Sequence, residues 1–144
     1  MREINKNIVT VQEGIIAHGV NCQKRMNSGV ARAIRARWPI VYEKYLSTNP
    51  TLGFVDFLPI KNNLIVANCY TQKYYGSDGR RYASISAIEN CMDTVIRYAA
   101  FLGLNVYIPR IGCGLGGLNW EEVKPIIKAI EEFYISSEVI VCSI

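Results

Sequence analysis

The chain alternates between short apolar runs, which predict buried strands, and longer segments whose apolar residues repeat every three or four positions, which predict helices. Strands are predicted at 14–20, 54–58, 63–70, 105–108 and 139–142. The run at 63–70 is almost continuously apolar, as expected of a strand that is covered on both faces.

Helical segments lie between these strands. Val30, Ile34 and Trp38 repeat every four residues, and Pro39 either ends this helix or begins the next one. A long helix follows Ser84, which is a candidate N-cap. The last helix presents one stripe that we predict to be core: Trp120, Val123, Ile127, Ile130 and Phe133. Strands alternating with helices imply one α/β domain over residues 1–144, a three-layer sandwich with helices on both faces of a mixed sheet, mostly parallel in the middle.

The segment at 109–119 is rich in glycine and joins a predicted strand to a predicted helix. Four of the eleven glycines fall within residues 112–117. Glycine lets backbone N–H groups approach a ligand closely, and a helix N-terminus adds free donors and a positive dipole end. The segment at 18–31 follows a second predicted strand. Because ligands of α/β sheets bind at the carboxyl ends of strands, both segments are predicted to form one cleft for an extended, phosphorylated, nucleotide-like ligand.

Composition limits the other classes of protein. No apolar run approaches the roughly 18–20 residues that span a membrane, and the first residues lack the apolar region of a signal peptide. We therefore expect a cytoplasmic protein with reduced cysteines, of which Cys69, Cys91 and Cys142 are core residues. With no CxxC pair and one histidine, a metal site is not expected. The net charge of +4 is mild and no basic run exceeds two residues, so neither nucleic acid nor a membrane is an expected partner.

The glycine segment formally matches a dinucleotide-binding fingerprint, Gly112-x-Gly114-x-x-Gly117. That interpretation requires an acidic residue near the end of the next strand to hold a ribose. The next strand ends Val141-Cys142-Ser143-Ile144 and contains no acid, which argues against a Rossmann fold.

Three separated motifs occur in one order: Ala-His-Gly-Val-Asn-Cys-Gln at 17–23, Met-x-Ser-Gly-Val-Ala at 26–31, and Ile-Pro-Arg-Ile-Gly-Cys-Gly-Leu-Gly-Gly-Leu-x-Trp at 108–120. Together they resemble the macrodomain family, in the branch that contains ADP-ribose-1''-phosphate phosphatases and the terminal ADP-ribose protein glycohydrolase. The strand at 64–72 is also similar to an internal strand of that branch. The resemblance implies an α/β/α sandwich that binds ADP-ribose, without a cofactor.

The resemblance also assigns roles to residues. Asn21 would contact the distal ribose, and Asn7 stands closest to the position from which many macrodomains read the adenine. The segment that closes over the ribose and phosphates would be Ser28, Gly29, Val30 and Ala31. The phosphate cradle would comprise Ile111, Gly112, Cys113, Gly114, Leu115, Gly116, Gly117 and Leu118.

The expected activity is hydrolysis of ADP-ribose-1''-phosphate or a related ADP-ribose derivative, with His18 and Asn21 as candidate catalytic residues. The resemblance implies this because that phosphatase branch also carries a histidine on the strand that leads to Asn21. Ala31 stands where some hydrolases of the family carry an aspartate. The lysine and aspartate of the terminal glycohydrolase fall near Thr71 and at Gly116. The alternatives are a non-catalytic ADP-ribose reader and a protein de-ADP-ribosylase, for which an ADP-ribosylated protein would be the partner. A third and weaker alternative, suggested by the positive charge, is binding of single-stranded nucleic acid in the same cleft.

Several side chains leave two interpretations open. His18 is either an acid–base catalyst or a hydrogen-bonded core residue. Cys113 is either a nucleophile activated by the helix N-terminus or a small residue tolerated in a tight loop. Arg110 either pairs with phosphate, faces outward or bridges to an acid. Arg80, Arg81 and Tyr82 either border the cleft or belong to a solvated charged loop. Tyr74 and Tyr75 either stack on a base or are aromatic residues of the loop without a ligand.

Overall fold

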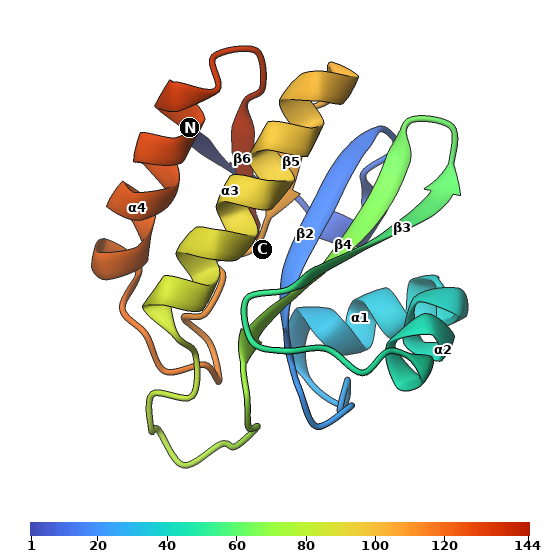
Figure 1. The fold of residues 1–144 in the computed structure, drawn as a ribbon, viewed down its shortest axis with the longest axis vertical. Helices are drawn as coiled ribbons and strands as arrows, with labels where there is room; N and C mark the ends of the chain where they lie inside the picture. Colours follow the sequence, from blue (N-terminus) through green and yellow to red (C-terminus); the bar gives the residue numbers. More distant parts are fainter.

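The computed structural model describes residues 1–144 and contains one mixed sheet of six strands between two layers of helices (Figure 1). The strands are β1 (Arg2–Asn5), β2 (Gly14–Asn21), β3 (Val55–Lys61), β4 (Leu64–Gln72), β5 (Val106–Ile108) and β6 (Val139–Ser143). The helices are η1 (Ile8–Thr10), α1 (Gly29–Arg37), α2 (Pro39–Ser47), α3 (Ile85–Leu102) and α4 (Trp120–Phe133). The strand order is β1-β6-β5-β2-β4-β3, and only the β3–β4 pair is antiparallel. The predicted fold class is confirmed.

Both faces of the central strands are buried, which explains their apolar runs. In β2, Ile15 and Ala17 pack into the cluster beneath α3 and α4, whereas Ile16 and Val20 pack into the cluster beneath α1 and α2. The same alternation runs along β4 because neighbouring side chains of a strand point to opposite faces. Cys69, Cys91 and Cys142 are buried, as predicted.

Most predicted elements are present, with small shifts at their ends. Pro39 is in the first turn of α2, and the Ser84 Oγ accepts a hydrogen bond from the Ala87 N–H at 3.2 Å. Strand β3 continues through Pro59, which an edge strand tolerates because one side of it needs no ladder hydrogen bond. Strand β1 and the short helix η1 were not predicted. Three of the four residues of β1 are exposed and only Ile4 is half-buried, so the strand contains no apolar run that would predict it.

The core stripe predicted for α4 is wrong at its last residue. Phe133 is 77% exposed, because the stripe continues from Ile130 to Tyr134, four residues on, rather than to Phe133, three residues on. Trp120 is half-buried and belongs to the wall of a cavity as well as to the core cluster. Val123 and Ile127 are buried, as predicted.

The loops that follow β2, β4 and β5 gather at the carboxyl edge of the sheet, at the bottom of Figure 1. This arrangement confirms that the segments 18–31 and 109–119 face one another. It adds a third segment, the loop at 73–84, which also borders the site. None of the helices has the length and hydrophobicity that a membrane crossing requires.

Candidate functional site

A cavity of about 920 Å³ opens at this edge of the sheet. We call it the main cavity. Its volume lies in the range of small-molecule sites, and its walls come from the ends of β2 and β4, the first turn of α1, the glycine loop and the start of α4. All of the predicted site residues line it except Asn7 and Gly117.

The shape of the glycine loop depends on residues without side chains. Gly112 and Gly117 have φ angles of 79° and 80°, which other residues rarely adopt. A Cβ on Gly116 would lie 2.6 Å from the carbonyl oxygen of Gly112, so the loop closes tightly on itself. A Cβ on Gly117 would collide with the backbone of Arg80. Gly117 therefore lies behind the cavity wall and supports it.

The same loop presents backbone donors that have no backbone partner. Gly117 N–H donates to the Gly114 carbonyl at 3.1 Å, and Leu118 N–H donates to Gly112 at 3.0 Å. The N–H groups of Gly112 and of residues 114–116 donate to no backbone carbonyl. Consecutive free N–H groups in a tight turn form a concave site for an anion.

The first turn of α1 forms the facing wall. Ser28 is the N-cap residue, but its side chain makes no capping hydrogen bond. The N–H groups of Gly29, Val30 and Ala31 have no carbonyl partner, as expected of the first turn of a helix. The positive end of the α1 dipole therefore borders the main cavity with its donors free.

Asn21 lines the main cavity, yet most of its hydrogen-bonding capacity organises its own loop. Its Oδ1 accepts from the Gln23 N–H at 2.9 Å and from the Arg25 N–H at 3.3 Å. Its Nδ2 donates to the Arg25 carbonyl at 2.9 Å. The Tyr45 hydroxyl donates to the Asn21 main-chain carbonyl at 2.5 Å and also lies 2.9 Å from Oδ1. One N–H of the amide is left for a ligand.

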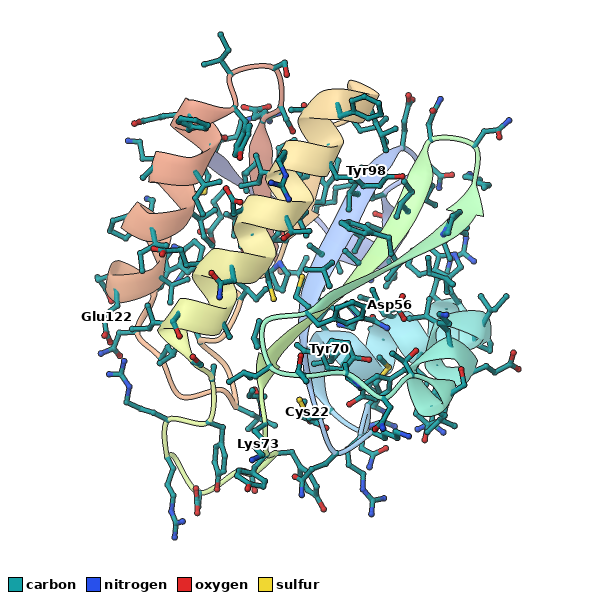
Figure 2. All side chains as sticks on the ribbon, in the orientation of Figure 1. Cys22, Asp56, Tyr70, Lys73, Tyr98 and Glu122 are labelled. Atoms are coloured by element: carbon teal, nitrogen blue, oxygen red, sulfur yellow. The ribbon has the colours of Figure 1, made fainter.

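Two tyrosines pack behind this loop. The ring of Tyr45 lies 5.9 Å from that of Tyr70, and burial raises the pKa of Tyr45 to about 12. Tyr70 lies between Asp56 and Cys22 in Figure 2, and its buried hydroxyl has no hydrogen-bond partner. Tyr45 holds the Asn21 loop through its hydroxyl, from the side of the sheet covered by α1 and α2.

His18 is 1% exposed, and its Nε2 lies 2.6 Å from the Oδ1 of Asn68, its neighbour on β4. Because Asn68 Oδ1 only accepts, we assign the proton to Nε2, which leaves Nδ1 as a buried acceptor without a partner. Burial lowers the pKa of His18 to about 4, and the Asn68 hydrogen bond partly offsets this. His18 is thus neutral at pH 7, which favours the hydrogen-bonded core residue over a general acid.

We expect the protein to lose stability as the pH falls from about 6.5 to about 4. Over that window the unfolded chain binds a proton at His18 and the folded protein does not, so acid favours unfolding by about 3 kcal/mol in total. Urea unfolding of the wild type and of His18→Gln at each pH isolates this contribution, because the other groups titrate in both proteins. His18 is the single histidine, so its proton resonance is unambiguous. A midpoint near 6.5 would contradict the burial of the neutral ring.

Thr71 and Gly19 are cavity residues that sequence analysis did not select. The Oγ1 of Thr71 is buried without a hydrogen-bond partner, and both residues line the main cavity. A Cβ on Gly19 would lie 2.6 Å from that Oγ1, so only glycine leaves room beside the hydroxyl. The available signal was the place of Thr71 at the end of β4, near the position of the terminal glycohydrolase's lysine.

The other candidate side chains are explained by contacts within the protein. Burial raises the pKa of the Cys113 thiol, which favours a small loop residue over an activated nucleophile. Arg110 lines the cavity wall but pairs with Glu3 on β1, Nη2 to Oε2 at 3.1 Å, and its hydrogen bonds lower the pKa of Glu3. The bridge to an acid is thus the correct interpretation of Arg110.

The loop at 73–84 contributes one aromatic ring to the cavity. Tyr75 lines it, and its N–H donates to the Gln23 Oε1 at 2.9 Å, which ties this loop to the loop after β2. Tyr74 and residues 80–82 do not line the cavity. Arg81 instead pairs with Glu122 at 2.9 Å, at the lower end of α4 in Figure 2. Residues 80–82 are therefore a charged surface loop.

Asn7 is not brought to the main cavity. It is exposed, and its Oδ1 accepts a hydrogen bond from the Val9 N–H at 3.2 Å as the cap of η1. No group of three or more His, Cys, Asp or Glu is arranged as a metal site.

Known proteins are similar to this chain in sequence and in fold. No model of a known family matches the chain. A protein of Enterobacteria phage T4, described as an uncharacterized 17.5 kDa protein in the tk-vs intergenic region, is 30% identical over 135 residues, covering 78% of this chain and 76% of that protein. A solved structure of a protein of unknown function from Bacteroides thetaiotaomicron is 28% identical, with a TM-score of 0.86 over 99% of this chain and 96% of that one.

Other solved structures that are similar to this chain are macrodomains. A macrodomain protein from Streptomyces coelicolor is 25% identical, with a TM-score of 0.81 over 100% of this chain and 99% of that one. A Trypanosoma brucei macrodomain, solved in complex with ADP-ribose, shares the fold at 13% identity, with a TM-score of 0.76 over 97% of this chain and 62% of that one. The present chain has the macrodomain fold.

Proposed function

We propose that the protein binds ADP-ribose in the main cavity. The observation that carries this proposal is the row of backbone N–H groups at 114–116, which faces no carbonyl of the protein. A diphosphate is the group that such donors suit, because its charge is spread over several oxygens and the donors cost no reorganisation when it binds. The macrodomains that share this fold include structures in complex with ADP-ribose.

The two walls of the cavity suit the two halves of this ligand. The first turn of α1, with its free N–H groups at 29–31, stands opposite the glycine loop and would hold the distal ribose and its substituents. The free N–H of Asn21 would donate to a ribose hydroxyl. The adenine would lie toward the side of the glycine loop away from α1. Asn7 does not line the main cavity, so it would contact the adenine only where the ligand extends beyond that cavity.

A second candidate function is hydrolysis of ADP-ribose-1''-phosphate, and the buried hydroxyl of Thr71 favours it. An unpartnered polar atom among the lining residues is a group kept for a ligand or for water. In the proposed step a water oxygen attacks phosphorus, the bond between phosphorus and the ribose oxygen breaks, and inorganic phosphate and ADP-ribose leave. Thr71 would position that water, and free N–H groups would stabilise the charge on the phosphoryl oxygens. Neutral His18 would accept a hydrogen bond at Nδ1.

The substitution Thr71→Val separates binding from hydrolysis. It keeps the shape of the side chain and removes a hydroxyl with no partner, so we expect unchanged or slightly higher stability. We expect the affinity for ADP-ribose, measured by calorimetry, to stay within about threefold, and phosphate release from ADP-ribose-1''-phosphate to fall at least about tenfold.

Product analysis with the wild-type protein distinguishes the phosphatase, the reader and the de-ADP-ribosylase. Incubation with ADP-ribose-1''-phosphate, mono-ADP-ribosylated peptide and O-acetyl-ADP-ribose, followed by chromatography, assigns the substrate. Binding of ADP-ribose without any product would make the protein a reader and would refute the hydrolase. Release of ADP-ribose from the peptide would make it a de-ADP-ribosylase. Absence of ADP-ribose binding would refute both proposals.

A further inference from the structure

Positive charge is concentrated in one part of the chain. Residues 21–48 contain six Lys and Arg residues against a single acid, Glu43, which gives a net charge of +5. The rest of the chain, with ten Lys and Arg and eleven Asp and Glu, has a net charge of −1. The six basic residues are Lys24, Arg25, Arg32, Arg35, Arg37 and Lys44. Most of them belong to α1 and α2, which pack side by side on one face of the sheet (Figure 1).

These basic side chains have no acidic partner in the protein. Four arginines outside this segment, Arg2, Arg80, Arg81 and Arg110, each form an ion pair with a carboxylate. None of the six basic residues of 21–48 forms one. Unpaired cations on one face create a positive field that attracts and orients an anionic partner.

A second cavity, of about 480 Å³, lies between α1 and α2. We call it the α1–α2 groove. The guanidinium of Arg35 lies 3.6 Å from the ring centroid of Tyr42, and its Nη1 donates to the Oδ1 of Asn27 at 3.2 Å. These two contacts hold a planar cation at the groove with a fixed orientation. Arg32 is exposed beside it and makes no side-chain hydrogen bond.

We propose that the α1–α2 groove binds single-stranded nucleic acid. Arg32 and its unpaired neighbours contact phosphates, and the fixed plane of Arg35 offers a surface on which a base stacks. Asn27 and Glu43 also line the groove and supply the amide and carboxylate groups that hydrogen-bond to base edges. An acidic peptide suits this groove less well, because a peptide of Asp and Glu has no ring to place on Arg35. The inference does not depend on the proposed ADP-ribose site.

The matched pair Arg32→Glu and Arg97→Glu tests this surface. Both arginines are exposed and make no side-chain hydrogen bond or ion pair, and both substitutions change the net charge by the same amount. Arg97 lies on α3, on the opposite face of the sheet. With a fluorescein-labelled 12-nucleotide DNA strand at low salt, measured by anisotropy, we expect Arg32→Glu to weaken binding at least about tenfold and Arg97→Glu less than about threefold. The affinity of the wild type falls steeply with salt, and the slope becomes shallower in Arg32→Glu.

Three further measurements complete the test. Arg35→Lys keeps the charge but removes the planar guanidinium on which a base would stack, so we expect the affinity for the strand to fall about threefold to tenfold. Saturating ADP-ribose is expected to weaken binding of the strand less than about threefold, because Arg32 and Arg35 lie outside the main cavity and the two cavities share only Asn27. A polyglutamate of equal charge competes weakly. Equal losses in the two Glu variants, displacement of the strand by ADP-ribose, equal competition by polyglutamate, or no binding by the wild type would each overturn the proposal.

Discussion

Gly114→Glu is expected to abolish ADP-ribose binding, with a loss of about a hundredfold or more, while the unfolding temperature stays within about 1 °C of the wild type. A Cβ at Gly114 would meet no atom of the protein within 4 Å, and its φ angle is not positive, so the fold accepts a side chain there. The same side chain would enter the main cavity beside the free N–H groups. A carboxylate at that place occupies the space and repels a diphosphate.

A graded series at this position separates steric from electrostatic effects. Gly114→Ala is expected to cost a few-fold in affinity, Gly114→Gln at least about tenfold, and the Glu variant about tenfold more than Gln because of its charge. Calorimetric titration with ADP-ribose measures the affinity, and thermal unfolding monitors the fold. Unchanged affinity in the Glu variant would place the ligand elsewhere and refute the proposed cradle. The contrasting variant Gly117→Ala is expected to lower stability, because its Cβ meets the Arg80 backbone and its φ angle is positive.

Asn21→Ala is expected to lower the free energy of unfolding by about 2–3 kcal/mol and to weaken ADP-ribose binding at least about tenfold. The Oδ1 accepts from the N–H groups of Gln23 and Arg25, and the Nδ2 donates to the Arg25 carbonyl. A methyl group removes these contacts, while Tyr45 keeps its hydrogen bond to the Asn21 main-chain carbonyl. The loop that follows β2 then loses the conformation that forms one wall of the main cavity. Urea unfolding and calorimetry measure the two effects on the same protein.

Tyr45→Phe removes the hydroxyl that contacts the main-chain carbonyl and the Oδ1 of Asn21, and it serves as the intermediate case. We expect it to cost about 1 kcal/mol, with a loss of affinity smaller than that of Asn21→Ala. Asn49→Ala, at an exposed asparagine without a side-chain hydrogen bond, is the control and is expected to be neutral. If Asn21→Ala abolished turnover but left stability unchanged, Asn21 would act on the ligand alone and the bracing role would be wrong.

Local sequence predicted much of this fold for physical reasons that can be stated residue by residue. The run at 63–70 is apolar because β4 is covered on both faces, and Ser84 precedes α3 because its hydroxyl satisfies an N–H that the helix leaves free. The order of the loops placed both cavity walls at one edge of the sheet. Strand β1 escaped prediction because an edge strand with polar side chains has no periodic pattern. The interpretation of Arg110 stayed open because its partner Glu3 lies over a hundred residues away in the chain.

By itself the sequence determined the strands, the helices and the glycine segment, since each of these depends on contacts or backbone freedom within a few residues. Tertiary structure decided what the polar groups do. It paired His18 with Asn68 across two strands, turned most of the Asn21 amide toward its own loop, and left the Thr71 hydroxyl without a partner in the cavity. It also gathered basic residues, dispersed along 24–44 with no run longer than two, onto one layer of the fold. Hydrogen bonds, burial and charge fields depend on groups that are distant in the chain, and only the folded arrangement brings those groups together.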